Sequence, residues 1–189
     1  MPVAGLVLAA GAGERFGGGK QLAELDSRPL LEHVLAALAA APLDRVVVVL
    51  GAQAGEIKAS VDLHGAQAVI CRGWEEGQAA SLRAGIAALG GAGAAVVALG
   101  DQPRISARAV ERVLAARSPE ALAVRATYDG KPEHPVVLER VLFDAIARLR
   151  GDEGARTLLG GVAVRDVACD GLGRPDDVDT PEQLEVLRA

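Results

Sequence analysis

The chain has 189 residues, enough for one domain with a substantial core but few for two. Its formal net charge of −5 and its 2% aromatic content argue against a nucleic-acid-binding protein, whose surface is basic and carries base-stacking rings. No apolar run approaches the ~20 residues of a membrane helix, and the apolar start leads into glycine-rich sequence, unlike a cleaved signal peptide. We therefore expect a single domain, residues 1–189, that is cytoplasmic and has no membrane or nucleic-acid partner.

Short β-branched runs alternate with longer amphipathic stretches, a pattern typical of βαβ units around a mostly parallel sheet. The runs are too apolar to be half-exposed, so most of these strands are expected in the centre of the sheet. Residues 125–139 interrupt the alternation and are interpreted as a β-excursion over one end of the sheet. The expected strands are Gly5–Leu8, Arg45–Leu50, Gln67–Cys71, Ala94–Leu99, Ala121–Arg125, Pro135–Leu138 and Val164–Val167.

Four stretches with helical spacing of apolar residues predict helices. The first has Pro29 in its first turn, the second spans Ser81–Leu89, and the third has Ser106 as its N-cap. The last begins at Thr180, where Thr-Pro-Glu-Gln is a capping-box pattern with proline at the first helical position.

The first expected strand runs directly into a glycine-rich loop, residues 11–20, with the sequence GAGERFGGGK. Glycines let main-chain N–H groups approach an anion, and ligands of α/β sheets bind where a strand passes into such a loop. A dinucleotide fingerprint would need glycine at Phe16, and a Walker A motif would need Ser or Thr after Lys20. Arg15 and Lys20 could together hold a di- or triphosphate, although a flexible, solvated loop is the alternative.

A carboxylate follows the fourth expected strand, in Gly100-Asp101-Gln102-Pro103. This position places Asp101 at the carboxyl edge of the sheet beside the first loop. Mg²⁺ prefers one or two carboxylates together with phosphate oxygens and water, so Asp101 suits a metal ligand, and Asp179 could supply a second carboxylate. The alternatives are a turn residue at Asp101 and a helix-dipole contact at Asp179.

Residues 73–78 precede the second helix, whose N-terminal N–H groups could bind a phosphate or a polar base. Ser81 and Arg83 lie in its early turns, and the segment is interpreted as facing a ligand. Trp74 either packs on a flat heterocycle or anchors the core.

The segment Leu8-Ala9-Ala10-Gly11, with Arg15, Gly17 and Lys20, resembles the LAAGxxxRxGxxK signature of the sugar-phosphate and cofactor nucleotidyltransferases. Within that superfamily the chain most resembles the molybdenum-cofactor cytidylyltransferase branch of the molybdopterin-guanine-dinucleotide-synthase-like NTP transferases. The similarity continues in order along nearly the whole chain, through Trp74–Gly77, Ser81–Gly85, Gly100–Pro103, Gly130–Pro135, Gly151–Arg156 and Asp177–Pro181.

This resemblance implies a Rossmann-like α/β nucleotidyltransferase fold with a mostly parallel central sheet and helices on both faces. It implies an NTP over the first loop, Mg²⁺ held at Asp101, a phosphorylated pterin cofactor as acceptor, and pyrophosphate as leaving group. Ala10 favours CTP, because family members that open with LAAG often use CTP whereas related guanylyltransferases tend to have LAGG. A molybdoenzyme or its chaperone would be a further partner.

The residues and the resemblance together predict a set of site residues. The catalytic residues are Arg15, Lys20 and Asp101, and the metal ligands are Asp101 and Asp179. The nucleotide-binding residues are Leu8, Ala9, Ala10, Gly11, Gly13, Arg15, Lys20, Ser81 and Gly100. The acceptor-binding residues are Gly77, Pro132, His134, Asp152 and Arg156, although His134 could be structural, and Asp152 and Arg156 could simply cap and pair on a short helix.

Two other functions compete with this prediction. The chain could transfer a nucleotide to another phosphorylated acceptor, such as a sugar phosphate or a phospholactate-like acid. It could also be a non-catalytic cofactor-delivery protein, but the joint presence of Arg15, Lys20 and Asp101 argues against mere binding. A dehydrogenase is disfavoured because the dinucleotide fingerprint fails.

Overall fold

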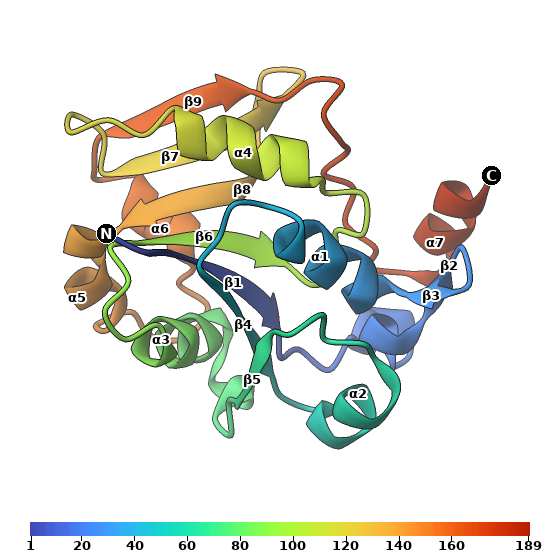
Figure 1. Ribbon diagram of the computed structural model, residues 1–189. Helices are drawn as coiled ribbons and strands as arrows, with labels where there is room; N and C mark the ends of the chain where they lie inside the picture. Colours follow the sequence, from blue (N-terminus) through green and yellow to red (C-terminus); the bar gives the residue numbers. More distant parts are fainter.

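A seven-stranded sheet runs through the middle of the computed structural model, which describes residues 1–189 (Figure 1). Its strand order is β5-β4-β1-β6-β8-β7-β9, and every neighbouring pair is parallel except those that β8 forms with β6 and β7. The expected mostly parallel α/β sheet is therefore confirmed. The strands are β1 (Val3–Ala9), β4 (Arg45–Leu50), β5 (Gln67–Ile70), β6 (Ala94–Leu99), β7 (Ala123–Tyr128), β8 (Lys131–Glu139) and β9 (Val164–Ala168).

Helices cover both faces of this sheet (Figure 1). One face carries α1 (Leu30–Ala39), α2 (Ala54–Ser60) and α4 (Ala107–Ala115), and the other carries α3 (Gln78–Ala88), α5 (Phe143–Ile146) and α6 (Ala155–Leu159). Successive residues of a strand point to opposite faces, so Val48 and Val96 join one apolar cluster while Val47 and Val97 join the other. Burial on both faces explains why the central strands are almost continuously apolar.

The C-terminal helix α7 (Pro181–Arg188) packs on a small hairpin made by β2 (Glu24–Leu25) and β3 (Arg28–Pro29). A third apolar cluster fills this contact and includes Leu25, Val178 and Leu184. The capping box predicted at Thr180 is confirmed, because its hydroxyl accepts from Gln183 N while the Gln183 side chain accepts from Thr180 N. The chain also forms short 3-10 helices, η1 (Glu14–Phe16), η2 (Lys20–Leu22), η3 (Trp74–Glu76) and η4 (Arg140–Leu142).

The interpretation of residues 125–139 as an excursion over one end of the sheet was wrong. β7 and β8 form a hairpin inside the sheet, and β8 is inserted between β6 and β7. The turn has positive φ at Asp129 (49°) and Gly130 (72°), as a two-residue hairpin loop of Asp-Gly requires.

The expectation that most strands are central fails for β5 and β9, which form the two edges of the sheet. Gln67 and Ile70 on β5 are exposed, as are Arg165 and Asp166 on β9. Two helix starts also differ: Pro29 is the N-cap of α1 rather than part of its first turn, and α3 begins at Gln78 rather than Ser81. None of the helices combines the length and the apolar character that crossing a membrane would require.

Candidate active site

The carboxyl ends of β1 and β6 form the floor of the candidate site. These two strands lie side by side, with Leu8 paired to Leu99, while the chain leaves β1 toward β4 on the opposite side. The connections therefore diverge at this edge, which is the place where ligands bind in open α/β sheets. The glycine-rich loop follows β1, and the Gly100–Pro103 turn follows β6.

A cleft of about 600 Å³ opens above this edge, a volume within the usual range for small-molecule sites. It is lined by the glycine-rich loop, the end of β6, the residues around the start of α3, and Asp179. Every predicted nucleotide-binding residue lines this cleft, namely Leu8, Ala9, Ala10, Gly11, Gly13, Arg15, Lys20, Ser81 and Gly100. The structure thus brings together residues from the first half and the C-terminal part of the chain.

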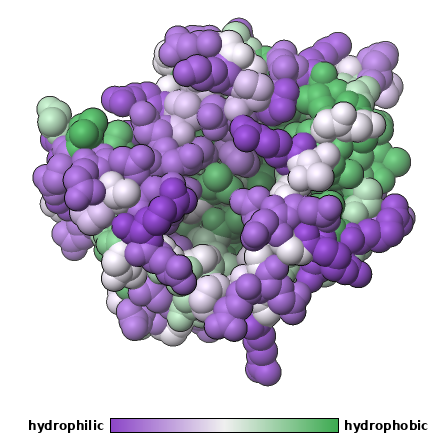
Figure 2. All heavy atoms as spheres, turned by 180° about the vertical axis from the view of Figure 1, so that it is seen from behind, coloured by the Kyte–Doolittle hydropathy of each residue, from purple (hydrophilic) through white to green (hydrophobic).

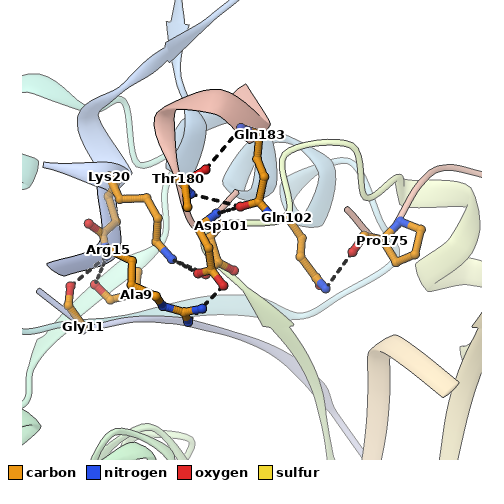
Figure 3. A network of polar contacts seen from close by, with 11 residues as sticks. Ala9, Gly11, Arg15, Lys20, Asp101, Gln102, Pro175, Thr180 and Gln183 are labelled. Carbon is orange, nitrogen blue, oxygen red and sulfur yellow. Dashed lines mark hydrogen bonds and ion pairs between the residues drawn. The ribbon is translucent and has the colours of Figure 1, made fainter. Parts of the chain in front are cut away.

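A network of ion pairs joins the charged residues of this cleft (Figure 3). Lys20 Nζ donates to Asp101 Oδ2 at 2.7 Å and to Asp179 Oδ1 at 3.0 Å, and only 11% of the Lys20 side chain is exposed. Burial disfavours the ammonium charge, but Asp101 and Asp179 outweigh this effect and raise the pKa of Lys20. Arg15 pairs with the other oxygen of Asp179 at 3.0 Å and is 77% exposed, so its guanidinium extends over the mouth of the cleft.

Hydrogen bonds to the main chain hold this network in place. The Gln21 side-chain amide donates to the carbonyls of Gly11 at 3.0 Å and Ala9 at 3.4 Å, which ties the start of the loop to β1 (Figure 3). The segment before α7 is tied to the end of β6, because Val178 N donates to Asp101 O at 3.0 Å. Gln102 is fully buried, and its amide donates to Pro175 O at 3.1 Å in the same segment.

The carboxylates of the cleft fit a divalent cation that arrives with phosphate ligands. Asp101 Oδ1 is buried without a hydrogen-bond partner, while Oδ2 is paired with Lys20. No group of three or more His, Cys, Asp or Glu side chains could hold a metal ion by itself. One or two carboxylates completed by phosphate oxygens and water is the arrangement that Mg²⁺ prefers.

A second cleft of about 310 Å³ adjoins the first, and the two share Leu8, Gln78 and Leu99 as lining residues. Its lining combines apolar side chains such as Leu82 and Val97 with charged ones. Seen from behind, the molecule has a hollow with an apolar floor and a hydrophilic rim (Figure 2). The polar lining residues of the second cleft are Gln78, Gln102, Arg125, Glu133, His134, Arg156 and Asp177.

The predicted acceptor-binding residues are divided between the two clefts. Pro132, His134 and Arg156 line the second cleft, whereas Gly77 and Asp152 line the first. Burial, with a smaller contribution from Arg156, lowers the pKa of His134 to about 4, so its imidazole is neutral at pH 7. Burial and the charge of Asp101 raise the pKa of Asp177 to about 6.

The N-terminus of α3 differs from the expectation of free N–H groups. Ala79 N donates to Gly151 O at 3.0 Å and Ala80 N donates to Gly77 O at 3.2 Å, so these donors are already used. Arg83 lines neither cleft, because it bonds Leu149 O and Glu76 on the outer side of the helix.

Several lining residues were not predicted, namely Gln21, Gln78, Gln102, Arg125, Glu133 and Asp177. Gln21 and Gln102 each adjoin a predicted residue, and their neighbours Lys20 and Asp101 were the available signal. Arg125 and Glu133 lie in the β7–β8 hairpin, whose place in the sheet was misinterpreted, so no local signal placed them at the cleft.

Comparison with known proteins gives matches over nearly the whole chain. Residues 5–167 match the family model of the MobA-like NTP transferase domain. The chain is 34% identical to nicotine blue oxidoreductase of Paenarthrobacter nicotinovorans, over 96% of this chain and 94% of that protein. It is 32% identical to the purine catabolism protein PucB of Bacillus subtilis, over 97% and 95% of the two chains.

Solved structures agree with these matches. The crystal structure of Rv0371c from Mycobacterium tuberculosis superposes with a TM-score of 0.90 and 33% identity, covering 99% of this chain and 97% of that one. A manganese complex of Rv0371c gives a TM-score of 0.84 and 30% identity, covering 99% and 98%.

Proposed function

This chain belongs to the MobA-like NTP transferase family, and from that premise we propose that it transfers CMP from CTP to the phosphate of a molybdenum-carrying pterin cofactor. The observation that carries the proposal is the state of Asp101. One of its carboxylate oxygens is buried without a partner and the other is paired with Lys20, in a cleft with the volume of a nucleotide site. A metal-bound triphosphate would provide partners for both the free Asp101 oxygen and the Lys20 ammonium.

In this proposal the nucleotide occupies the first cleft, with its phosphates along the glycine-rich loop. Asp101 and Asp179 would hold Mg²⁺, which would neutralise charge on the phosphates. Lys20 and Arg15 bind phosphate oxygens from two sides, since Lys20 is buried at the floor and Arg15 extends over the mouth. Positioning and charge stabilisation then supply most of the rate enhancement.

The acceptor would occupy the second cleft. One of its phosphate oxygens attacks the α-phosphorus, a new P–O bond forms, and the bond to the bridging oxygen breaks to release pyrophosphate. A phosphate monoester is largely dianionic near neutral pH because its second pKa is about 6, so the step needs no general base. The neutral His134 and the apolar floor suit the body of a heterocyclic cofactor, and Arg156 suits its anionic end.

The nucleotide base and the final recipient are proposed from the resemblance of the sequence. Ala10 lines the first cleft and is 4% exposed, and a LAAG opening is often found in members that use CTP. A molybdoenzyme or its chaperone would receive the product.

The first test is pyrophosphate release in the presence of Mg²⁺, each of the four common NTPs, and molybdenum-loaded pterin cofactor. We expect release with CTP alone, and only when the acceptor is present. Release that depends on a different phosphorylated acceptor would refute the pterin assignment but keep the reaction class. Tight NTP binding without release under any condition would favour a delivery protein.

Variants connect this assay to the cleft. Asp101→Asn should lower turnover by roughly 100-fold or more, because it removes charge from the proposed metal site. Asp144→Asn, on the exposed surface of α5, is the matched control and should behave like the wild type.

Reduction is the competing activity, because one relative is named an oxidoreductase. The same preparation should therefore be assayed for oxidation of NADH and NADPH in the presence of nicotine blue. Dye reduction without pyrophosphate release would overturn the proposed transfer. The loop itself argues against this outcome, since Phe16 stands where a dinucleotide fingerprint has glycine.

A further inference from the structure

The point where the two clefts meet is lined by Leu8, Leu99 and Gln78, which contact both clefts. Leu8 and Leu99 are paired across β1 and β6 and form the floor of this junction. Gln78 is the first residue of α3, and its side chain is exposed. It is the only polar side chain that lines both clefts.

The chemistry at this junction rests on the proposed function. If the nucleotide occupies the first cleft and the acceptor the second, the phosphorus that is transferred must lie where they meet. The floor there offers no hydrogen-bond donor, because both side chains are aliphatic. The main-chain carbonyls of the floor are acceptors, and these are already bonded. Leu8 O accepts from Gly100 N at 2.9 Å, and Leu99 O accepts from Gln102 N at 3.3 Å.

Gln78 is free to supply the missing donor. Its side chain is exposed and borders both clefts, so its amide N–H groups are available to a ligand. One neighbour restricts where the side chain lies, because the α6 N-cap Gly154 packs directly against its amide. A donor next to an apolar floor interacts more strongly with developing charge than it would in water.

We propose that Gln78 is a catalytic residue whose amide N–H donates a hydrogen bond to a non-bridging oxygen of the transferred phosphoryl group. As the acceptor oxygen bonds to the α-phosphorus, the electron pair of the breaking P–O bond leaves with pyrophosphate. Gln78 gives up no proton and forms no covalent bond in this step. Its contribution is to stabilise the negative charge on the equatorial oxygens and to fix the phosphorus over the junction.

A structural role for Gln78 makes a different prediction, because the residue also begins a helix. Glutamate at the first helical position interacts favourably with the helix dipole, so Gln78→Glu should keep or raise the stability of α3. The same carboxylate would repel the phosphates and could not donate when ionised. Stability and turnover are therefore expected to move in opposite directions in this variant.

The test measures kcat for pyrophosphate release, the Kd for Mg²⁺-CTP, and Tm in wild type, Gln78→Leu and Gln78→Glu. Gln78→Leu should lower kcat roughly 10- to 100-fold while the Kd changes less than about threefold. Gln78→Glu should be slower still, with a Tm equal to or above that of the wild type. Gln67→Leu, on the exposed edge strand β5, is the matched control and should match the wild type.

The outcomes separate this proposal from the one on which it rests. If the wild type is active and Gln78→Leu turns over at the same rate, or Gln78→Glu is faster than Gln78→Leu, the role of Gln78 is refuted and the function stands. If the wild type releases no pyrophosphate with any acceptor, the proposed function fails and the role of Gln78 fails with it.

Discussion

At the scale of single residues, Lys20 and the proposed divalent cation would compete for the same two carboxylates. The ammonium is bound to Asp101 at 2.7 Å and to Asp179 at 3.0 Å, and both carboxylates are the proposed metal ligands. A cation can approach them closely only if Lys20 turns toward another anion, and the phosphates of the incoming nucleotide are suited to receive it. Metal and nucleotide should therefore bind cooperatively.

We expect Lys20→Met to bind Mn²⁺ alone about tenfold more tightly than the wild type, a change of ~1.4 kcal/mol, because its competitor is gone. The same variant should lose the increase in Mn²⁺ affinity caused by the nucleotide, along with most of its turnover. Free Mn²⁺ measured by electron paramagnetic resonance gives these affinities, and Lys58→Met on the exposed face of α2 is the control. Unchanged or weaker Mn²⁺ binding would show that Lys20 does not occupy the metal position.

His134 should make stability depend on pH. Burial lowers its pKa from 6.5 to about 4, so between these values the unfolded chain binds a proton that the folded chain does not. Folding therefore loses stability as the pH falls through this window. Asp177, with a pKa raised from 3.8 to about 6, acts in the opposite direction over part of the same range.

A comparison of wild type with His134→Gln cancels the contribution of Asp177. Between about pH 7 and about pH 5, the wild type should lose ~1–2 kcal/mol more of its unfolding free energy than the variant. Urea denaturation at the two pH values measures this difference. Equal losses in both proteins would mean that His134 is protonated in the folded state as readily as in the unfolded one.

At the scale of elements, the start of α3 depends on a close contact with the loop before α6. Gly77 has φ 107°, and a Cβ atom added there would lie 2.5 Å from Gly151 O and 2.6 Å from Asp152 Oδ1. A side chain at this position would strain the backbone and push the loop away from the first cleft.

Gly77→Ala should therefore lower the unfolding free energy by roughly 1–3 kcal/mol. Gly55→Ala is the matched control, because Gly55 lies in helix α2 with open space around its Cα, and there alanine should stabilise by up to about 1 kcal/mol. Urea denaturation monitored by circular dichroism distinguishes the two. A neutral Gly77→Ala would indicate that the loop shifts without cost.

Local signals predicted the elements whose cause is local. The caps at Ser106 and Thr180 are confirmed, because a side chain and the N–H three residues later are enough to define them. The Asp129-Gly130 turn was an available local signal that was not used, and it would have identified the hairpin. The short helix α2 was not predicted, since Ile57 is its only buried residue and a single apolar position shows no periodicity.

Nonlocal contacts explain what could not be predicted. The strand order makes β5 and β9 the edges of the sheet, and the polar residues Gln67, Arg165 and Asp166 within them were a local sign of exposure that was not used. The hydrogen bond from Ala79 N to Gly151 O joins segments that are far apart in the chain. Neither segment has a sequence pattern that predicts it. Sequence likewise gives no sign that Gly77 and Asp152 line the first cleft while the other predicted acceptor-binding residues line the second.

At the scale of the whole molecule, one sheet supports both large apolar clusters, because the same strands contribute alternate residues to each. We infer that residues 1–189 fold as a single NTP transferase domain. Urea unfolding should then give coincident transitions by far-ultraviolet circular dichroism and by fluorescence of Trp74, the only tryptophan, which lines the first cleft. An earlier fluorescence transition would show that the cleft opens before the sheet unfolds.

The ion pair between Lys20 and Asp179 joins residues that are 159 positions apart, and it closes the candidate site. During synthesis the glycine-rich loop and Asp101 leave the ribosome well before Asp179 does, and N-terminal segments begin to fold first. A nascent chain would thus hold Lys20 and one carboxylate while the second carboxylate is still inside the ribosome. The proposed nucleotide site is therefore complete only once Asp179 has been synthesised, and a product terminated before it would lack one of the two proposed metal-binding carboxylates.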